Sequence, residues 1–145
     1  MFNGKSLILI VDDEPKIRIL VSKWLIDDGY LIDTASDGND CINKTNINTD
    51  LILLDIMMPG PTPDEIINEV VRKNPHVKIA YLTAVDAFSP TKEQEEKGWI
   101  ASIKPPVIGY IQKPVESEEL LKKVKSYIKK KITAMTLKKH EMTKY

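Results

Sequence analysis

The sequence predicts an α/β fold, a doubly wound five-stranded parallel sheet with helices on both faces. Short apolar runs alternate five times along the chain with segments whose apolar residues recur at helical spacing. Two of the runs, residues 7–11 and 51–54, contain no polar residue, which is typical of central parallel strands. The length of 145 residues suits one compact domain with a single core.

The first strand, residues 7–11, is followed by a helix that begins near Pro15 and stops at Gly29. Proline is favoured at a helix start because its missing amide hydrogen costs little there, and glycine is typical of a helix end. Apolar residues at helical spacing are predicted to share the core-facing side of this helix: Ile17, Leu20, Val21, Trp24 and Leu25.

A second strand is predicted over residues 30–35, and an Asp37-Gly38 turn leads from it into a short polar helix that ends near Thr45. The third strand, residues 51–54, runs directly into Asp55. Residues 58–63 are predicted to be a loop, because three prolines within five residues interrupt both strands and helices. A third helix follows, and Asn74-Pro75 is predicted to end it. Its apolar side consists of Ile66, Ile67, Val70 and Val71.

The last third of the chain contains the fourth and fifth strands, residues 77–83 and 107–112. A short charged helix is predicted between them over residues 90–97, followed by an irregular stretch over residues 99–106. The last helix starts near Ser117 and is predicted to pack one apolar side on the sheet: Leu120, Leu121, Val124, Ile128 and Ile132.

The chain is predicted to form one domain, residues 1–132, followed by a lysine-rich extension of the last helix, residues 133–145. Twenty-one basic and 21 acidic residues balance overall, so no global field selects nucleic acid or a membrane. From Ser117 onward, however, nine lysines face three glutamates. We expect a cytoplasmic protein, because no apolar run approaches the length of a signal-peptide core or a membrane span. Cys41 is the only cysteine, which excludes an intrachain disulfide.

Three carboxylates lie just past the ends of predicted strands, Asp12 and Asp13 after the first strand and Asp55 after the third. If these strands are neighbours, the three acids converge, and like charges at close range oppose ionisation. A hard cation removes that cost, and Mg²⁺ held by one or two carboxylates is the usual solution. One aspartate after a strand can equally be a turn or helix cap, but three at two strand ends favour a metal site.

Thr83 ends the fourth predicted strand and Lys113 follows the fifth. Function in such sheets collects at the carboxyl ends of the strands, so we expect this hydroxyl and ammonium near the acids. Phosphoryl transfer needs these groups: a carboxylate as nucleophile, and a cation and a lysine to stabilise charge on the phosphoryl oxygens. Lys113 before Pro114 is a weak signal alone, because such a lysine is often a solvated loop residue.

Four short segments, in order and at the right strand ends, resemble the receiver domain of two-component response regulators: VDDEP at 11–15, LDIMMPG at 54–60, LTA at 82–84 and YIQKP at 110–114. The resemblance covers about the first 130 residues. It implies a flavodoxin-like (βα)5 fold with strand order 2-1-3-4-5.

Carried over by position, the resemblance implies that Asp55 is the phosphoacceptor. Asp13 resembles the direct metal ligand, with Asp12 assisting through water. The Met57 backbone carbonyl matches a further ligand, and Mg²⁺ is the implied cofactor.

The remaining matched residues concern catalysis and switching. Lys113 corresponds to the lysine that pairs with the phosphoryl group, and Thr83 to the hydroxyl that follows it. Tyr110 matches the switch aromatic, which turns inward when Thr83 moves. Alternatively, Tyr110 is a half-buried edge-strand tyrosine packed against the last helix.

The resemblance implies a stand-alone, phosphorylation-activated signalling switch. Its expected partners are a histidine kinase or phosphotransfer protein and a downstream protein reached by protein–protein contact. Such a switch is expected to catalyse its own phosphorylation and dephosphorylation and not to be a turnover enzyme. Two rival functions stay open: a pseudo-receiver that binds partners without phosphorylation, and a phosphatase with an aspartyl nucleophile. The phosphatase usually needs a second acid two residues on, where Met57 stands.

Two departures from the family pattern concern loops. Pro63 replaces the glycine that commonly follows the phosphoacceptor by eight residues, so we expect the loop before the third helix to be rebuilt. Thirty residues separate Thr83 from Lys113, and the excess falls in residues 99–106. This altered face suggests an unusual partner or a homodimer. Neither a membrane nor nucleic acid is expected as a partner, since no recognition helix or second domain follows.

Overall fold

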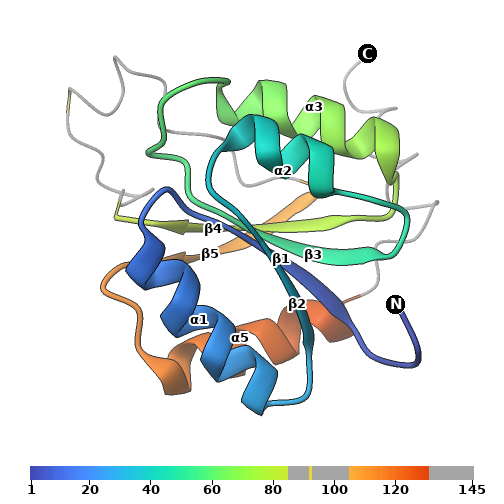
Figure 1. The fold of residues 1–145 in the computed structure, drawn as a ribbon, viewed down its shortest axis with the longest axis vertical. Coiled ribbons are helices and arrows are strands. Elements are labelled where there is room, and N and C mark those ends of the chain that lie inside the picture. The colour runs from blue at the N-terminus through green and yellow to red at the C-terminus, as the bar shows by residue number, and fades with distance from the viewer. Residues whose placement is uncertain (85–91, 93–104, 131–145) are drawn as a thin grey trace.

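The computed structural model describes residues 1–84, 92 and 105–130, which fold around one parallel sheet (Figure 1). Its strands are β1 Leu7–Val11, β2 Leu31–Ala35, β3 Thr49–Leu54, β4 Lys78–Thr83 and β5 Val107–Gln112. The strands pair in parallel, in the order β2-β1-β3-β4-β5. The predicted doubly wound sheet and its strand order are therefore confirmed.

The helices form an outer layer on each face of the sheet: α1 Pro15–Asp27, α2 Gly38–Lys44, α3 Pro63–Lys73 and α5 Ser117–Lys129. Helices α1 and α5 cover one face, and α2 and α3 cover the other (Figure 1). Among these described helices, none combines the length and apolar character needed to cross a membrane. The helix expected over residues 90–97 falls outside the described residues except for Lys92, as do residues 99–104, Ile132 and the segment 133–145.

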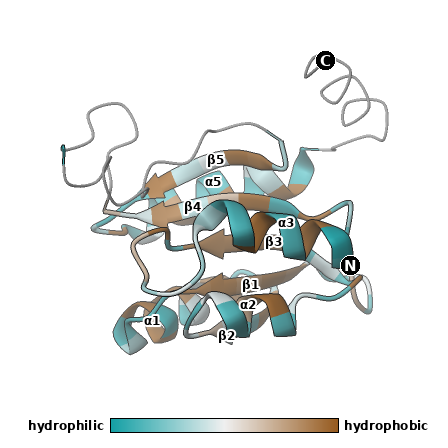
Figure 2. Cartoon of the chain, turned by 90° about the horizontal axis from the view of Figure 1, so that it is seen from above, coloured by the Kyte–Doolittle hydropathy of each residue, from teal (hydrophilic) through white to brown (hydrophobic). Residues whose placement is uncertain are grey.

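Buried side chains alternate along each strand between the two faces of the sheet. In β1, Leu9 and Val11 pack toward α2 and α3, whereas Ile8 and Ile10 pack toward α1 and α5. This period of two is the geometry of a β-strand, and it places an apolar side chain on each covered face. The strands accordingly form the hydrophobic centre of the molecule (Figure 2). Each fully buried aliphatic side chain contributes about 1.5–3 kcal/mol to folding.

Helix α1 buries a narrower side than its apolar spacing predicts. Val21 and Leu25 are fully buried, but Leu20 is 41% exposed. Successive helical residues are rotated by about 100°, so Leu20 lies at the margin of the side that contains Val21. Ile19 and Ile26 are also exposed, which gives α1 an apolar outer surface.

The loop before α3 ends one residue earlier than predicted, because Pro63 is the first residue of the helix. The prediction that Pro63 lies in the loop is therefore wrong. Proline fits a first helical position, where its fixed φ is suitable and no amide hydrogen is needed. The Thr62 hydroxyl oxygen accepts a hydrogen bond from the Glu65 amide (3.2 Å) and caps the helix. Gly60 supplies the left-handed conformation in this loop, with φ of +100°.

The carboxyl end of α5 is fastened to β4 by Lys78. Its ammonium donates hydrogen bonds to the carbonyl oxygens of Tyr127 (2.9 Å), Ile128 (2.8 Å) and Lys130 (3.0 Å). These carbonyls lie at the carboxyl end of the helix, where the helix dipole makes a cation favourable. Burial lowers the pKa of Lys78. The contact fixes α5 against the sheet up to the point where the helix ends.

Replacing Tyr81 with phenylalanine is expected to raise the free energy of unfolding by about 1–2 kcal/mol, because its hydroxyl is buried and unsatisfied. Tyr81 is 2% exposed, and within the described part of the chain its hydroxyl has no hydrogen-bond partner. Tyr127→Phe is the matched control, since the Tyr127 hydroxyl donates to the Tyr110 carbonyl (3.3 Å) and its loss should cost stability. Urea unfolding measures both. A Tyr81→Phe protein less stable than the parent would contradict this expectation.

Candidate functional site

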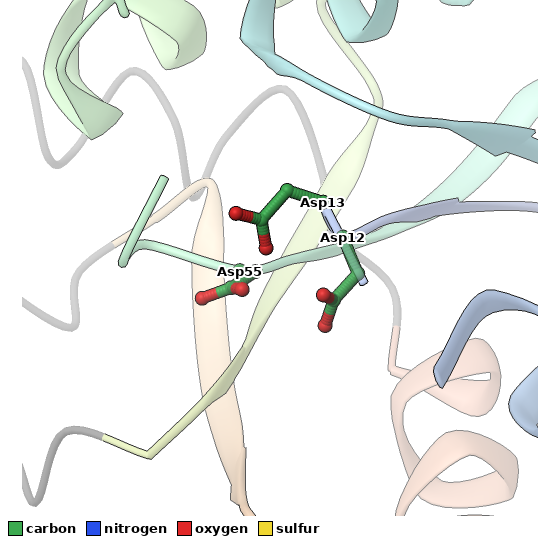
Figure 3. A group of neighbouring side chains, drawn as sticks. All are labelled: Asp12, Asp13 and Asp55. Atoms are coloured by element: carbon green, nitrogen blue, oxygen red, sulfur yellow. The ribbon is translucent and has the colours of Figure 1, made fainter. Parts of the chain in front are cut away.

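Three carboxylates converge at the carboxyl ends of β1 and β3. These strands are neighbours, with Val11 paired to Leu54, so the residues that follow them meet at one edge of the sheet. One oxygen each of Asp12, Asp13 and Asp55 lies within 4.8 Å of the others (Figure 3). Asp12 and Asp55 are buried and Asp13 is exposed. The predicted convergence of the three acids is confirmed.

Lys113 joins this group from the end of β5. Its ammonium forms ion pairs with Asp12 Oδ2 (2.7 Å) and Asp55 Oδ2 (3.2 Å). Since β4 lies between β3 and β5, the lysine side chain reaches across the end of β4 to the acids. The ion pairs place one cation between two buried anions, which offsets part of their mutual repulsion.

The local environment shifts the pKa values of Asp55 and Lys113 upward. Burial raises the pKa of Asp55, opposed by the hydrogen bond from the Met57 amide and by the Lys113 ammonium. For Lys113, burial alone opposes the charged form, but the carboxylates of Asp12 and Asp55 outweigh it and raise the pKa. The lysine is therefore held as an ammonium beside Asp55.

Backbone amides orient the two buried carboxylates. The Met57 amide donates to Asp55 Oδ1 (2.9 Å), and the Glu14 amide donates to Asp12 Oδ1 (2.9 Å). In each case the donor lies two residues further along, so the turn after the strand fixes the acid at its start. In both acids Oδ1 is held by the backbone, while Oδ2 faces the ammonium.

Thr83 lies at this edge of the sheet as the last residue of β4, and Tyr110 lies within the neighbouring strand β5. Thr83 is buried at the end of β4, and its carbonyl accepts a hydrogen bond from the Lys113 amide (2.9 Å). Tyr110 pairs with Tyr81 in the sheet, three residues before Lys113, and packs against the core that faces α2 and α3. The structure thus brings four of the predicted side chains together: Asp12, Asp13, Asp55 and Lys113. Tyr110 lies apart from this group.

The donor set fits a hard divalent cation. Asp12, Asp13 and Asp55 offer carboxylate oxygens only, the ligands that Mg²⁺ and Ca²⁺ prefer, and the exposed Asp13 keeps one side open to water. The Met57 amide contacts Asp55, which places this residue beside the acid cluster, and its carbonyl stays a predicted further ligand. The site therefore suits a cation that keeps several water molecules.

One contact at the site was not foreseen from the sequence. Arg18, the fourth residue of α1, donates from Nη1 to the Asp12 carbonyl oxygen (2.7 Å). An arginine among the apolar residues of a helix normally indicates only a solvated position. Residue spacing carries no signal for this contact, because it depends on the angle at which α1 leaves β1.

Comparison with known proteins agrees with this geometry. The family model described as the response regulator receiver domain matches residues 8–125. The transcriptional regulatory protein ResD of Bacillus subtilis is 35% identical over 128 residues, which are 88% of this chain and 50% of ResD. The chain therefore spans about half the length of this curated relative.

Two solved structures share the fold. The chemotaxis protein CheY4 of Vibrio cholerae has a TM-score of 0.67 and 33% identity, covering 86% of this chain and 99% of CheY4. The response regulator TrrA of Thermotoga maritima, solved with Mg²⁺ and BeF, has a TM-score of 0.64 and 35% identity, covering 84% of this chain and 98% of TrrA. TrrA has also been solved in complex with the histidine kinase ThkA. With its sheet order, its acid cluster and the family match over residues 8–125, the chain belongs to the response-regulator receiver family.

Proposed function

We propose that this chain is a phosphorylation-activated signalling switch in which Asp55 accepts a phosphoryl group from a histidine kinase or phosphotransfer protein. The observation that carries the proposal is the Lys113 ammonium, 3.2 Å from Asp55 and 2.7 Å from Asp12, beside three clustered carboxylates. The kinase complex of TrrA, a relative at 34% identity in that structure, supports the class of phosphoryl donor.

In the proposed reaction a carboxylate oxygen of Asp55 attacks the phosphorus of a phosphohistidine. A new phosphorus–oxygen bond forms, the phosphorus–nitrogen bond breaks, and the imidazole leaves. The Met57 amide holds one Asp55 oxygen in place, which fixes the nucleophile before the donor arrives. Lys113 lies within reach of the incoming phosphoryl oxygens and stabilises their negative charge.

We propose that Mg²⁺ is held by Asp13 and Asp55 directly, by Asp12 through water, and by the Met57 carbonyl. When bound, the cation supplies charge neutralisation for the carboxylates and the phosphoryl oxygens. Asp12 keeps its ion pair with Lys113, which is consistent with an indirect role toward the metal.

We propose that the phosphorylated state is read out through Thr83 and Tyr110. Thr83 stands at the strand end that Lys113 crosses, where its hydroxyl can bond a phosphoryl oxygen, and Tyr110 lies on the next strand. A ligand shifts such an equilibrium only by binding two arrangements differently. The resulting surface signals to a downstream protein by direct contact, with residues 1–132 as the receiver domain. The chain acts as a switch and not as a turnover enzyme.

Incubation with Mg²⁺ and acetyl phosphate is expected to add one acid-stable, base-labile phosphoryl group, and Asp13→Ala is expected to remove the Mg²⁺ dependence together with most of the labelling. Asp13 is exposed, so its loss should leave the fold intact while removing a metal ligand. Intact mass spectrometry with and without a chelator measures the result. Asp33→Ala, an exposed acid on β2, is the control. A parent protein that is never labelled would point to the phosphorylation-independent binding module instead.

A further inference from the structure

Arg18 contacts the peptide group that joins two of the proposed metal ligands. Its Nη1 donates to the carbonyl oxygen of Asp12 at 2.7 Å, in a partly buried position. That carbonyl belongs to the peptide bond between Asp12 and Asp13. The orientation of this one peptide plane therefore sets the direction in which both side chains leave the backbone.

The other polar groups of Asp12 are already held by different partners. Its amide donates to the Ala35 carbonyl (3.1 Å), its Oδ1 accepts from the Glu14 amide, and its Oδ2 faces Lys113. The amide of Asp55 bonds the carbonyl of Val11 (2.9 Å), one residue before Asp12. The Asp12 carbonyl thus lies beyond the last hydrogen bond of the β1–β3 ladder, and it accepts a hydrogen bond from the Arg18 guanidinium instead. A charge-assisted bond of this length is about twice as strong as a neutral one.

We propose that Arg18 is a positioning residue that orients the Asp12–Asp13 peptide and thereby sets the affinity of the site for Mg²⁺. The inference rests on the proposed function, since it concerns the same cation. Mg²⁺ demands near-ideal octahedral geometry, so a small rotation of the peptide that displaces the Asp13 carboxylate is costly. Loss of groups that orient metal ligands typically costs about 10–100-fold in metal affinity.

Whether removal of Arg18 weakens or strengthens Mg²⁺ binding distinguishes a positioning role from a purely electrostatic one. A guanidinium close to the acids repels an incoming cation, so on Coulombic grounds its removal strengthens Mg²⁺ binding. Positioning has the opposite consequence, because removal of Arg18 frees the peptide and weakens binding. Lys23, on the same helix and exposed, provides a substitution that removes one charge without touching Asp12.

The test is the dissociation constant of Mg²⁺, measured by titration calorimetry on the full chain for the parent, Arg18→Gln, Arg18→Lys and Lys23→Gln. We expect Arg18→Gln to weaken binding about 10–100-fold, Arg18→Lys to recover part of the loss, and Lys23→Gln to match the parent. Circular dichroism without metal verifies that each variant is folded. If Arg18→Gln is not folded, the Mg²⁺ affinity of Arg18→Lys tests the inference, and we expect this variant to bind Mg²⁺ more weakly than the parent.

Phosphorylation by acetyl phosphate supplies a second readout. If Arg18 acts through the metal ligands, the Mg²⁺ concentration for half-maximal rate rises in Arg18→Gln, while the rate at saturating Mg²⁺ returns toward the parent value. Unchanged or tighter Mg²⁺ binding in Arg18→Gln overturns the inference, as does an equal loss in Lys23→Gln. A parent protein that binds no Mg²⁺ refutes the proposed metal site itself, which is a different outcome.

Discussion

Replacing Lys113 with methionine is expected to destabilise the metal-free protein by about 3–5 kcal/mol, the usual cost of removing one partner from a buried ion pair. Lys113 is 17% exposed, and its ammonium faces Asp12 and Asp55, which are 0% and 3% exposed. Methionine preserves much of the side-chain volume, so the loss reports the charge and not a cavity. Two buried carboxylates then face each other without a cation.

Mg²⁺ is expected to restore part of the stability lost in Lys113→Met, because the metal neutralises the same carboxylates and binds only the folded chain. Urea unfolding with and without Mg²⁺ measures both effects. Lys122→Met, on the exposed side of α5, is the control and should match the parent. The initial rate of labelling by acetyl phosphate should fall about 10²–10³-fold, as for loss of one group that stabilises transition-state charge. A Lys113→Met protein as stable as the parent would show that the ion pairs contribute nothing to folding.

Asp55→Asn is expected to abolish labelling by acetyl phosphate, because an amide oxygen is a poor nucleophile and cannot form the acyl phosphate. The substitution is nearly isosteric, and the asparagine oxygen can still accept the hydrogen bond from the Met57 amide. It also removes one of three crowded charges, so the metal-free protein should be at least as stable as the parent.

Asp33→Asn provides the matched control for this substitution. Asp33 is exposed on β2, and its Oδ1 accepts a hydrogen bond from the Thr34 amide (2.9 Å), which asparagine can also accept. Labelling followed by intact mass spectrometry should give full incorporation in Asp33→Asn and none in Asp55→Asn. Undiminished labelling of Asp55→Asn would remove Asp55 as the acceptor.

The central strands could be predicted from the sequence because burial on both faces leaves an unbroken apolar run, whereas their order was implied only by the family resemblance. Residues 7–11 were predicted with the bounds that β1 has, and residues 51–54 are the fully buried part of β3. The sequence misleads where one residue type fits two structures. The proline pattern predicts Pro63 in the loop, although proline also suits a first helical position. The apolar spacing predicts Leu20 in the core, although its rotation puts it at the margin of the buried side.

The acid cluster was predictable because parallel strands bring their carboxyl ends together, which turns two distant sequence positions into one site. The sequence does not predict which side chains contact these acids at the carboxyl edge of the sheet. The double ion pair of Lys113 with Asp12 and Asp55 depends on a side chain crossing the end of β4. The bond from Arg18 to the Asp12 carbonyl depends on the angle at which α1 leaves β1. Such angles are set by packing and are not encoded in residue spacing.

The most direct measurement is the position of the phosphoryl group in the parent protein. Borohydride reduces an aspartyl phosphate to homoserine, so the labelled residue can be located by peptide mass spectrometry after labelling with acetyl phosphate and Mg²⁺. The account predicts homoserine at position 55 and nowhere else, in proportion to the phosphoryl incorporated, since Asp55 is the acid that Met57 and Lys113 hold at the centre of the site. Homoserine at position 12 or 13, or a phosphoryl group that resists borohydride, would contradict it.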